Sequence, residues 1–284
     1  MAVHVSPVVR GRRLAAELRR LREGAGLTIK DVAATLECST AKLSRIENGQ
    51  VKLRIQDARE LLDLYAVSGP RREQLLDLVR QARAKGWWQG YADLIPDGAE
   101  TFVGLEDEAH RLEVHALGLV PGLLQTARYA WEMNTSFADL PLHVTARYTE
   151  LHLTRQLILS RPDPVLLHAV IDESALRRQV GGPQVMAEQC RHLIETAGRP
   201  NITIQVLPFA VGAHQGAAYS YNIAAFANAA DPKVVYVGML NDCIYHTDAE
   251  HVGRYEAAFA QATATALDPA ASIGFLDQVA RAAG

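Results

Sequence analysis

Residues 28–49, with the sequence TIKDVAATLECSTAKLSRIENG, constrain the fold of this chain more than any other stretch. Thr28 and Asp31 have the spacing of a helix N-cap and its capping partner. Ser39 is placed to cap a second helix. The stretch therefore predicts two short helices joined by a tight turn.

Apolar side chains recur at helical spacing in both predicted helices. Val32, Ala33 and Leu36 form a stripe on the first helix, whereas Leu43 and Ile46 face inward on the second. The small Ala33 suits a position where two steeply crossing helices come closest. The pattern predicts a helix-turn-helix, whose second helix enters the major groove of DNA. The alternative is an ordinary helical hairpin of a bundle, with its cationic residues on a solvated face.

The exposed side of the second helix supplies the candidate DNA contacts. Thr40 and Ala41 can touch thymine methyl groups, and Arg45 can pair with guanine O6 and N7. Lys42 and Ser44 can serve either a base or a phosphate. The full predicted set of DNA-binding residues is Ser39, Thr40, Ala41, Lys42, Ser44, Arg45, Asn48, Lys52, Arg54, Arg12 and Arg13.

Basic residues also precede the first helix, which is predicted at 12–24. Arg10, Arg12 and Arg13 form an arm that can follow a phosphate backbone or enter a minor groove. A solubilising tail is the alternative interpretation. At the end of the motif, the backbone amides of Asn48 and Gly49 can cap a phosphate.

The run LSRIENG after a capped helix resembles the DNA-binding domain of the XRE family of regulators, named for the xenobiotic response element. Two residues depart from that family's pattern. Glu37 stands where the turn usually has glycine, and Ile29 stands where glutamine often opens the first helix. A non-glycine residue in a left-handed turn costs about 1 kcal/mol. The resemblance also implies phosphate contacts from Lys52 and Arg54, for which ordinary loop solvation is the alternative.

The charge of the 284-residue chain is unevenly distributed. Residues 1–88 carry 17 Lys and Arg against 10 Asp and Glu, a net +7, whereas the remainder carries 12 against 22, a net −10. We expect the first part to face nucleic acid and the acidic second part to project away from it. No apolar run approaches the roughly 18 residues needed to cross a bilayer, and residues 1–13 lack the apolar stretch of a signal peptide. We therefore expect a cytoplasmic protein with no membrane partner.

Helical periodicity and turn residues divide the chain into two predicted domains. Residues 1–86 form a five-helix domain, with helices at 12–24, in the two motif segments, at 55–65 and at 70–85. Residues 87–104 are interpreted as a packed linker, in which Trp87 and Trp88 hold the two domains together. A ligand-stacking role for the two tryptophans is the alternative.

Residues 105–284 are predicted to form an α+β domain. Runs of β-branched and aromatic residues indicate strands of one sheet at 165–171, 202–207, 219–226, 234–237 and 243–246. Helices are predicted at 105–117, 121–134, 142–160, 183–197, 249–266 and 269–282. The predicted fold class is thus an all-α five-helix helix-turn-helix domain followed by an α+β domain.

The second domain shows no catalytic or cofactor motif. It lacks GxxxxGKS/T, GxGxxG, H-E-x-x-H and a nucleophile elbow. Cys38, Cys190 and Cys243 form no C-x-x-C pair and are interpreted as small buried apolar residues. We expect a protein that is not an enzyme, with no cofactor and no metal site.

Polar residues after the predicted strands are the candidates for a small-molecule site. The predicted ligand-binding residues are His168, Arg178, His214 and Tyr219. Other polar residues of this region are Asp172, Glu173, Arg177, Asn241, Asp242, Tyr245 and His246. A histidine in an apolar strand, such as His168, is more simply a hydrogen-bonded structural residue. An enzyme with an acid and base site near His168, Asp172 and His214 remains an alternative.

The runs LVPGLLQTARYA, IDESALRRQVGGP and NITIQVLPFAVGAH extend the resemblance to actinobacterial XRE regulators with a large C-terminal domain of uncharacterised function. The resemblance implies an antitoxin-like regulator whose C-terminal domain binds a small neighbour-encoded protein or a small-molecule effector. We expect a homodimeric repressor on a roughly palindromic double-stranded DNA operator, with the dimer contact in the second domain or linker. The alternatives are a module that neutralises a small partner protein and an enzyme.

Overall fold

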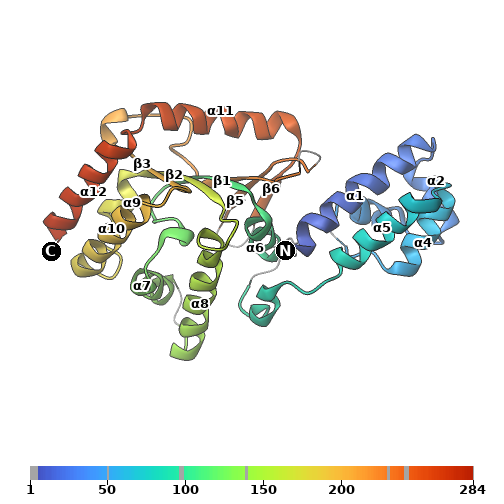
Figure 1. Ribbon diagram of the computed structural model, residues 1–284, viewed down its shortest axis with the longest axis horizontal. Coiled ribbons are helices and arrows are strands. Elements are labelled where there is room, and N and C mark those ends of the chain that lie inside the picture. Colours follow the sequence, from blue (N-terminus) through green and yellow to red (C-terminus); the bar gives the residue numbers. More distant parts are fainter. Residues whose placement is uncertain are drawn as a thin grey trace. The chain divides into compact units, whose positions relative to one another are not determined.

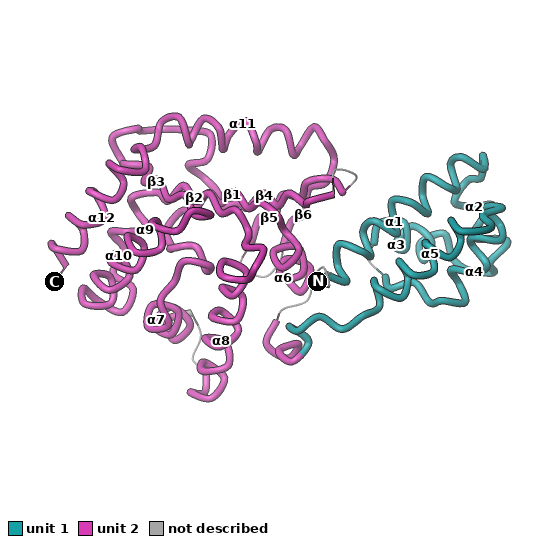
Figure 2. Tube along the Cα trace, viewed as in Figure 1, with its two compact units in different colours: residues 1–89 teal, residues 90–284 magenta. Residues whose placement is uncertain are grey.

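The computed structural model describes residues 6–49, 51–95, 99–137, 140–228, 231–239 and 243–283. The chain divides into two compact units, Met1–Gln89 (unit 1) and Gly90–Gly284 (unit 2), as Figure 2 shows. The two units bury separate hydrophobic cores. Among the helices of the described residues, none combines the length and the apolar character that crossing a membrane requires.

Unit 1 is helical, and the five helices among its described residues confirm the predicted all-α class. They are α1 (Pro7–Gly24), α2 (Ile29–Thr35), α3 (Thr40–Glu47), α4 (Ile55–Leu64) and α5 (Gly69–Ala82). A 3₁₀ turn at Trp87–Tyr91 then spans the boundary between the units. Trp88 is buried and meets Trp87 edge to face at 5.9 Å.

The caps of the motif helices form as the sequence predicts. The backbone N–H of Asp31 donates to Thr28 Oγ1 at 3.2 Å, and the backbone N–H of Thr28 donates to Asp31 Oδ2 at 2.8 Å. The Thr28 hydroxyl also donates to Asp31 Oδ2 at 2.7 Å, and this bond, together with the one from the Thr28 backbone N–H, holds the pKa of Asp31 below its usual value. Ser39 Oγ accepts from the backbone N–H of Lys42 at 3.1 Å. Both helix starts are thus fixed by short-range contacts.

The predicted basic arm is wrong, because Arg10, Arg12 and Arg13 lie inside helix α1. This helix begins at Pro7 rather than at residue 12, since Ser6 Oγ accepts from the backbone N–H of Val8 at 3.3 Å and caps it. Proline also suits the first helical turn, where its missing N–H leaves no bond unmade.

Unit 2 contains one mixed six-stranded sheet. Its strands are β1 (Arg111–Ala116), β2 (Leu166–Asp172), β3 (Ile202–Leu207), β4 (Tyr221–Ala225), β5 (Val234–Gly238) and β6 (Cys243–His246). Their order is β3-β2-β1-β4-β5-β6. Strands β1, β2 and β3 run parallel, whereas β4, β5 and β6 each run antiparallel to the strand before them in this order.

Strand β1 corrects the helix predicted at 105–117. Residues 99–108 form helix α6 (Ala99–Glu108), and the chain then turns into the strand. The apolar residues Leu112, Val114 and Ala116 stand at every second position of β1 and are buried. This two-residue period places them on one face of the sheet, and the helical interpretation missed it.

Helices cover both faces of the sheet (Figure 1). They are α7 (Ala127–Phe137), α8 (Leu142–Arg155), α9 (Glu173–Arg177), α10 (Pro183–Ala197), α11 (Ala249–Thr265) and α12 (Pro269–Ala283). The predicted helix at 121–134 is shorter, because residues 122–124 form a 3₁₀ turn before α7. One core joins α10 and α12 to the sheet, and another joins α11 to its opposite face. The α+β class is confirmed.

Candidate nucleic-acid interface

Helix α3 has a buried inner side and an exposed outer side. Leu43 is 1% exposed and Ile46 is 5% exposed, so these side chains anchor the helix in the core of unit 1. Thr40, Ala41 and Arg45 are exposed. The residue types that can meet base edges therefore lie on the accessible side of the helix.

The turn between α2 and α3 is tight and left-handed. Ala33 is buried, and its carbonyl accepts from the backbone N–H of Cys38 at 2.9 Å. Glu37 has φ of +47°, the conformation that glycine adopts without steric cost. The turn keeps the geometry that the motif needs despite the absent glycine.

Replacing Glu37 with glycine stabilises unit 1 by about 0.5–1 kcal/mol, because the left-handed strain is relieved. The same replacement at Glu60, an exposed residue inside right-handed α4, destabilises unit 1 by a similar amount. Chemical denaturation with hydrogen exchange of the unit 1 amides measures both changes. A loss of stability for Glu37→Gly would contradict the strain.

Arg45 and Lys42 differ in the hydrogen bonds and ion pairs that they form within the protein. The Arg45 guanidinium forms no hydrogen bond or ion pair with any described residue. Lys42 is half-buried, and its Nζ pairs with Asp57 Oδ2 of α4 at 3.1 Å. Arg45 is therefore the cation of α3 that is available to DNA, whereas Lys42 also ties α3 to α4.

The remaining predicted DNA contacts surround the end of α3. Asn48 is exposed, and its Nδ2 donates to Oγ of half-buried Ser44 at 3.4 Å. Lys52 and Arg54 are exposed in the loop before α4, and Ser39 is exposed at the start of α3.

Arg12 and Arg13, the two residues of α1 in the predicted DNA-binding set, occupy different surroundings. A Cβ on Gly49 would lie 3.6 Å from Cα of Arg12, so Arg12 packs beside the end of α3. Arg13 lines a hollow of about 240 Å³ together with Arg71 and Glu17, on the side of α1 that faces α5. Of these two residues, Arg12 is thus the one placed beside the predicted reading helix.

A buried ion pair joins α1 to the end of α3. Arg22 Nε donates to Glu47 Oε1 at 2.7 Å, and Arg22 Nη2 donates to Glu47 Oε2 at 3.0 Å. The side chains are 9% and 4% exposed. This bidentate contact raises the pKa of Arg22. Sequence reasoning missed the pair, because no local spacing marks two partners in separate helices.

Unit 2 brings together only part of the predicted ligand-binding set. Arg178 and His214 line the same hollow, which Asp172 also borders. His168 lies elsewhere, with its Nε2 2.8 Å from Gln205 Oε1 and its ring edge-on to Phe259. The catalytic constellation of His168, Asp172 and His214 therefore does not form in this hollow.

Tyr219, the last residue of the predicted ligand-binding set, lies at the surface. The Tyr219 side chain is 65% exposed, and its carbonyl lies 3.2 Å from Nδ1 of buried His115, a residue the sequence reasoning did not single out. Burial lowers the pKa of His115. Asn241 and Asp242 lie outside the described residues.

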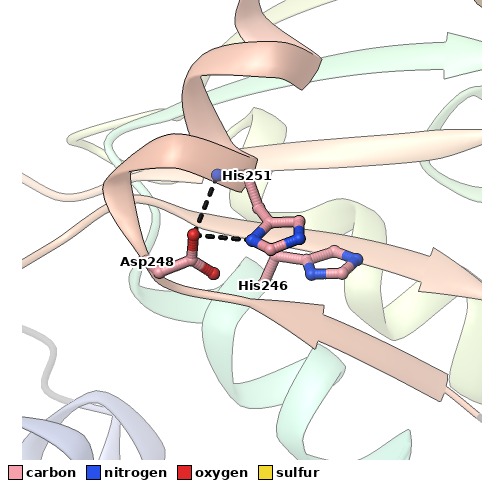
Figure 3. Close-up of side chains that lie close together, drawn as sticks. All are labelled: His246, Asp248 and His251. Carbon is pink, nitrogen blue, oxygen red and sulfur yellow. Dashed lines mark hydrogen bonds and ion pairs between the residues drawn. The ribbon is translucent and has the colours of Figure 1, made fainter.

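His246, Asp248 and His251 form a polar cluster at the start of α11 (Figure 3). Asp248 Oδ1 accepts from the backbone N–H of His251 at 2.9 Å and lies 2.6 Å from its Nδ1. The two imidazole rings stack at 5.0 Å. Such donors can hold a cation, but an exposed N-cap with its partner accounts for the Asp248 contacts.

Comparisons with protein families agree with the division into two units. A family model described as a helix-turn-helix domain matches residues 13–75. A model described as a domain of unknown function (DUF5753) matches residues 99–278. No curated protein and no solved structure matches the chain. The helix-turn-helix match supports a DNA-binding regulator, with helices α2 and α3 inside the matched segment.

Proposed function

Because the chain belongs to the DUF5753 family and carries a helix-turn-helix domain ahead of it, we propose that it is a dimeric, sequence-specific transcriptional repressor of the XRE type. One observation carries the proposal: capped helix α3 buries Leu43 and Ile46 and leaves Thr40, Ala41 and Arg45 exposed. Such a helix can insert into a major groove without unfolding any part of unit 1.

Each exposed group of α3 has a defined task in this proposal. Arg45 pairs with O6 and N7 of a guanine through two parallel hydrogen bonds. The methyl groups of Thr40 and Ala41 pack against thymine methyls. Lys52 and Arg54 contact phosphates and fix the position of α3 without reading sequence. The net charge of +7 on unit 1 strengthens attraction to the duplex.

Two copies on one operator supply the affinity and the specificity. Their α3 helices enter successive major grooves about 34 Å apart, so the operator is roughly palindromic. Unit 2 provides the dimer contact and senses a small molecule, which changes how fully the operator is occupied. Unit 2 has no catalytic role in this proposal.

A second candidate function is supported by an apolar hollow of about 500 Å³ on α7 and α8. Trp131, Leu153 and Leu157 line it, and the Leu157 side chain is 63% exposed. Exposed apolar surface of this kind marks a site of protein contact. Unit 2 would then bind a small partner protein here, as an antitoxin-like module does.

Selection of bound sequences from a random DNA pool, using the full chain, tests the main proposal. We expect an inverted repeat with half-sites one helical turn apart. Enrichment of no sequence above the pool would contradict sequence-specific binding. A partner protein bound without any DNA preference would favour the second candidate.

Salt dependence provides a separate prediction. Two copies that each place Lys52 and Arg54 on phosphates neutralise about four charges, so log K against log salt has a slope of about −3.6 or steeper. Arg54→Ala removes one phosphate contact per copy and flattens the slope by about 1.8. Titrations at several salt concentrations measure both slopes. A slope unchanged by Arg54→Ala would place this residue away from the phosphates.

A further inference from the structure

A hollow of about 350 Å³ lies at the carboxyl ends of the three parallel strands of unit 2. Asp172 ends β2, whereas Leu117 and Phe209 follow β1 and β3 closely. In open α/β sheets, small molecules bind outside the carboxyl ends of parallel strands, because the connecting loops there form a crevice. The volume suits a small ligand.

Two opposite charges line this hollow without neutralising each other. Arg178 Nε donates to the carbonyl of Gly118 at 2.9 Å, and its two Nη groups have no hydrogen-bond partner among the described residues. Asp172 Oδ1 accepts from the backbone N–H of Ser174 at 2.8 Å and from its hydroxyl, whereas Oδ2 accepts from no described residue. Arg178 and Asp172 form no ion pair with each other.

Gly118 and His214 shape the surroundings of these charges. A Cβ on Gly118 would lie 3.9 Å from Nε and Nη2 of Arg178, so the guanidinium rests on the glycine backbone with φ of +67°. His214 also lines the hollow, and its buried Nδ1 has no hydrogen-bond partner among the described residues. The hollow thus contains more hydrogen-bond donors and acceptors than the described protein groups use.

The remaining wall is apolar. Leu117 is half-buried, and the Phe209 side chain is 58% exposed. A ligand that fits this hollow therefore carries one anionic group, one cationic donor and one apolar group. The anion pairs with the Arg178 fork, the cation with Asp172 Oδ2, and the apolar group with Leu117 and Phe209.

We propose that this hollow binds a free α-amino acid with an apolar side chain. The ligand carboxylate accepts two parallel hydrogen bonds from Arg178, and its ammonium donates to Asp172. A phosphate or simple carboxylate would use Arg178 alone and would be repelled by Asp172. This site supplies the ligand for the sensing role proposed for unit 2. Binding of the amino acid does not depend on that proposed function, whereas its effect on operator occupancy rests on it.

Calorimetric titration of the full chain with L-leucine and L-phenylalanine tests the site. We expect one of these to bind, and Asp172→Asn and Arg178→Gln each to weaken binding about ten- to a hundredfold, because each removes a charged hydrogen-bond partner. Asparagine still caps α9, so Asp172→Asn keeps the local fold. Arg177→Gln is the control, because neighbouring Arg177 does not line the hollow, and it leaves affinity unchanged.

Derivatives of the amino acid that lack one of its two charges test whether the site recognises a zwitterion or a simple anion. N-acetylated and amidated forms of the bound amino acid should each bind at least about tenfold more weakly. Equal binding of the N-acetylated form, or no binding of either amino acid, overturns the inference.

Operator affinity of the same preparations distinguishes the two proposals. A protein that binds its operator but neither amino acid overturns the amino-acid site and leaves the proposed repressor intact. A protein that binds the amino acid through Arg178 and Asp172 but no DNA sequence overturns the proposed repressor and supports the site.

Discussion

Replacing Glu47 with glutamine destabilises unit 1 by about 3–5 kcal/mol, because it leaves the buried Arg22 charge without its carboxylate. Both side chains are less than a tenth exposed, and water does not replace the lost partner. Arg22 Nη1 also donates to the carbonyl of Leu27 at 2.8 Å, so the guanidinium cannot swing out without breaking a further bond. Since domains are stable by only about 5–15 kcal/mol, the variant approaches unfolding.

Hydrogen exchange of the α1 and α3 amides in the full chain measures this loss, and the amides of unit 2 in the same sample serve as an internal reference. Asp77→Asn is the matched control: it breaks the exposed ion pair with Arg80 on α5 and changes stability by less than about 0.5 kcal/mol. Combining Glu47→Leu with Arg22→Met removes both charges and recovers most of the stability. A change below about 1 kcal/mol for Glu47→Gln would show that the pair is not buried in solution.

Local signals in the sequence predicted much of the fold. Thr28, Asp31 and Ser39 fixed two helix starts because an N-cap acts over two or three residues. The prediction at 183–197 coincides with α10, which has a proline in its first turn. Five strands were predicted because β-branched runs lie between turn residues.

Long-range contacts explain what the sequence did not predict. Strand β1 carries the polar residues Glu113 and His115 between its buried apolar residues, and only pairing with β2 and β4 decides between helix and strand there. The partners Arg22 and Glu47 are 25 residues apart. Arg178 and His214 were named from the sequence, but the hollow that brings His214 beside Asp172 and Arg178 follows from the topology of unit 2 rather than from their spacing.

Replacing Arg45 with alanine weakens operator binding by about 1–3 kcal/mol per reading helix, because a bidentate contact to guanine is lost. With two copies on one palindrome, the loss applies twice. The loss is confined to operators that carry the preferred base pair at the contacted position. At that position the variant binds all four base pairs almost equally, since alanine offers no donor to O6 or N7.

Affinities for operators substituted at each position in turn measure this change. Arg54→Ala is the control, because a phosphate contact is lost on every sequence and affinity falls uniformly. Arg45→Lys keeps the positive charge but not the planar fork, so it retains general DNA affinity while discrimination falls. If Arg45→Ala weakened all sequences equally, Arg45 would contact phosphate, and the reading of sequence would have to come from Thr40, Ala41 and Ser44 instead.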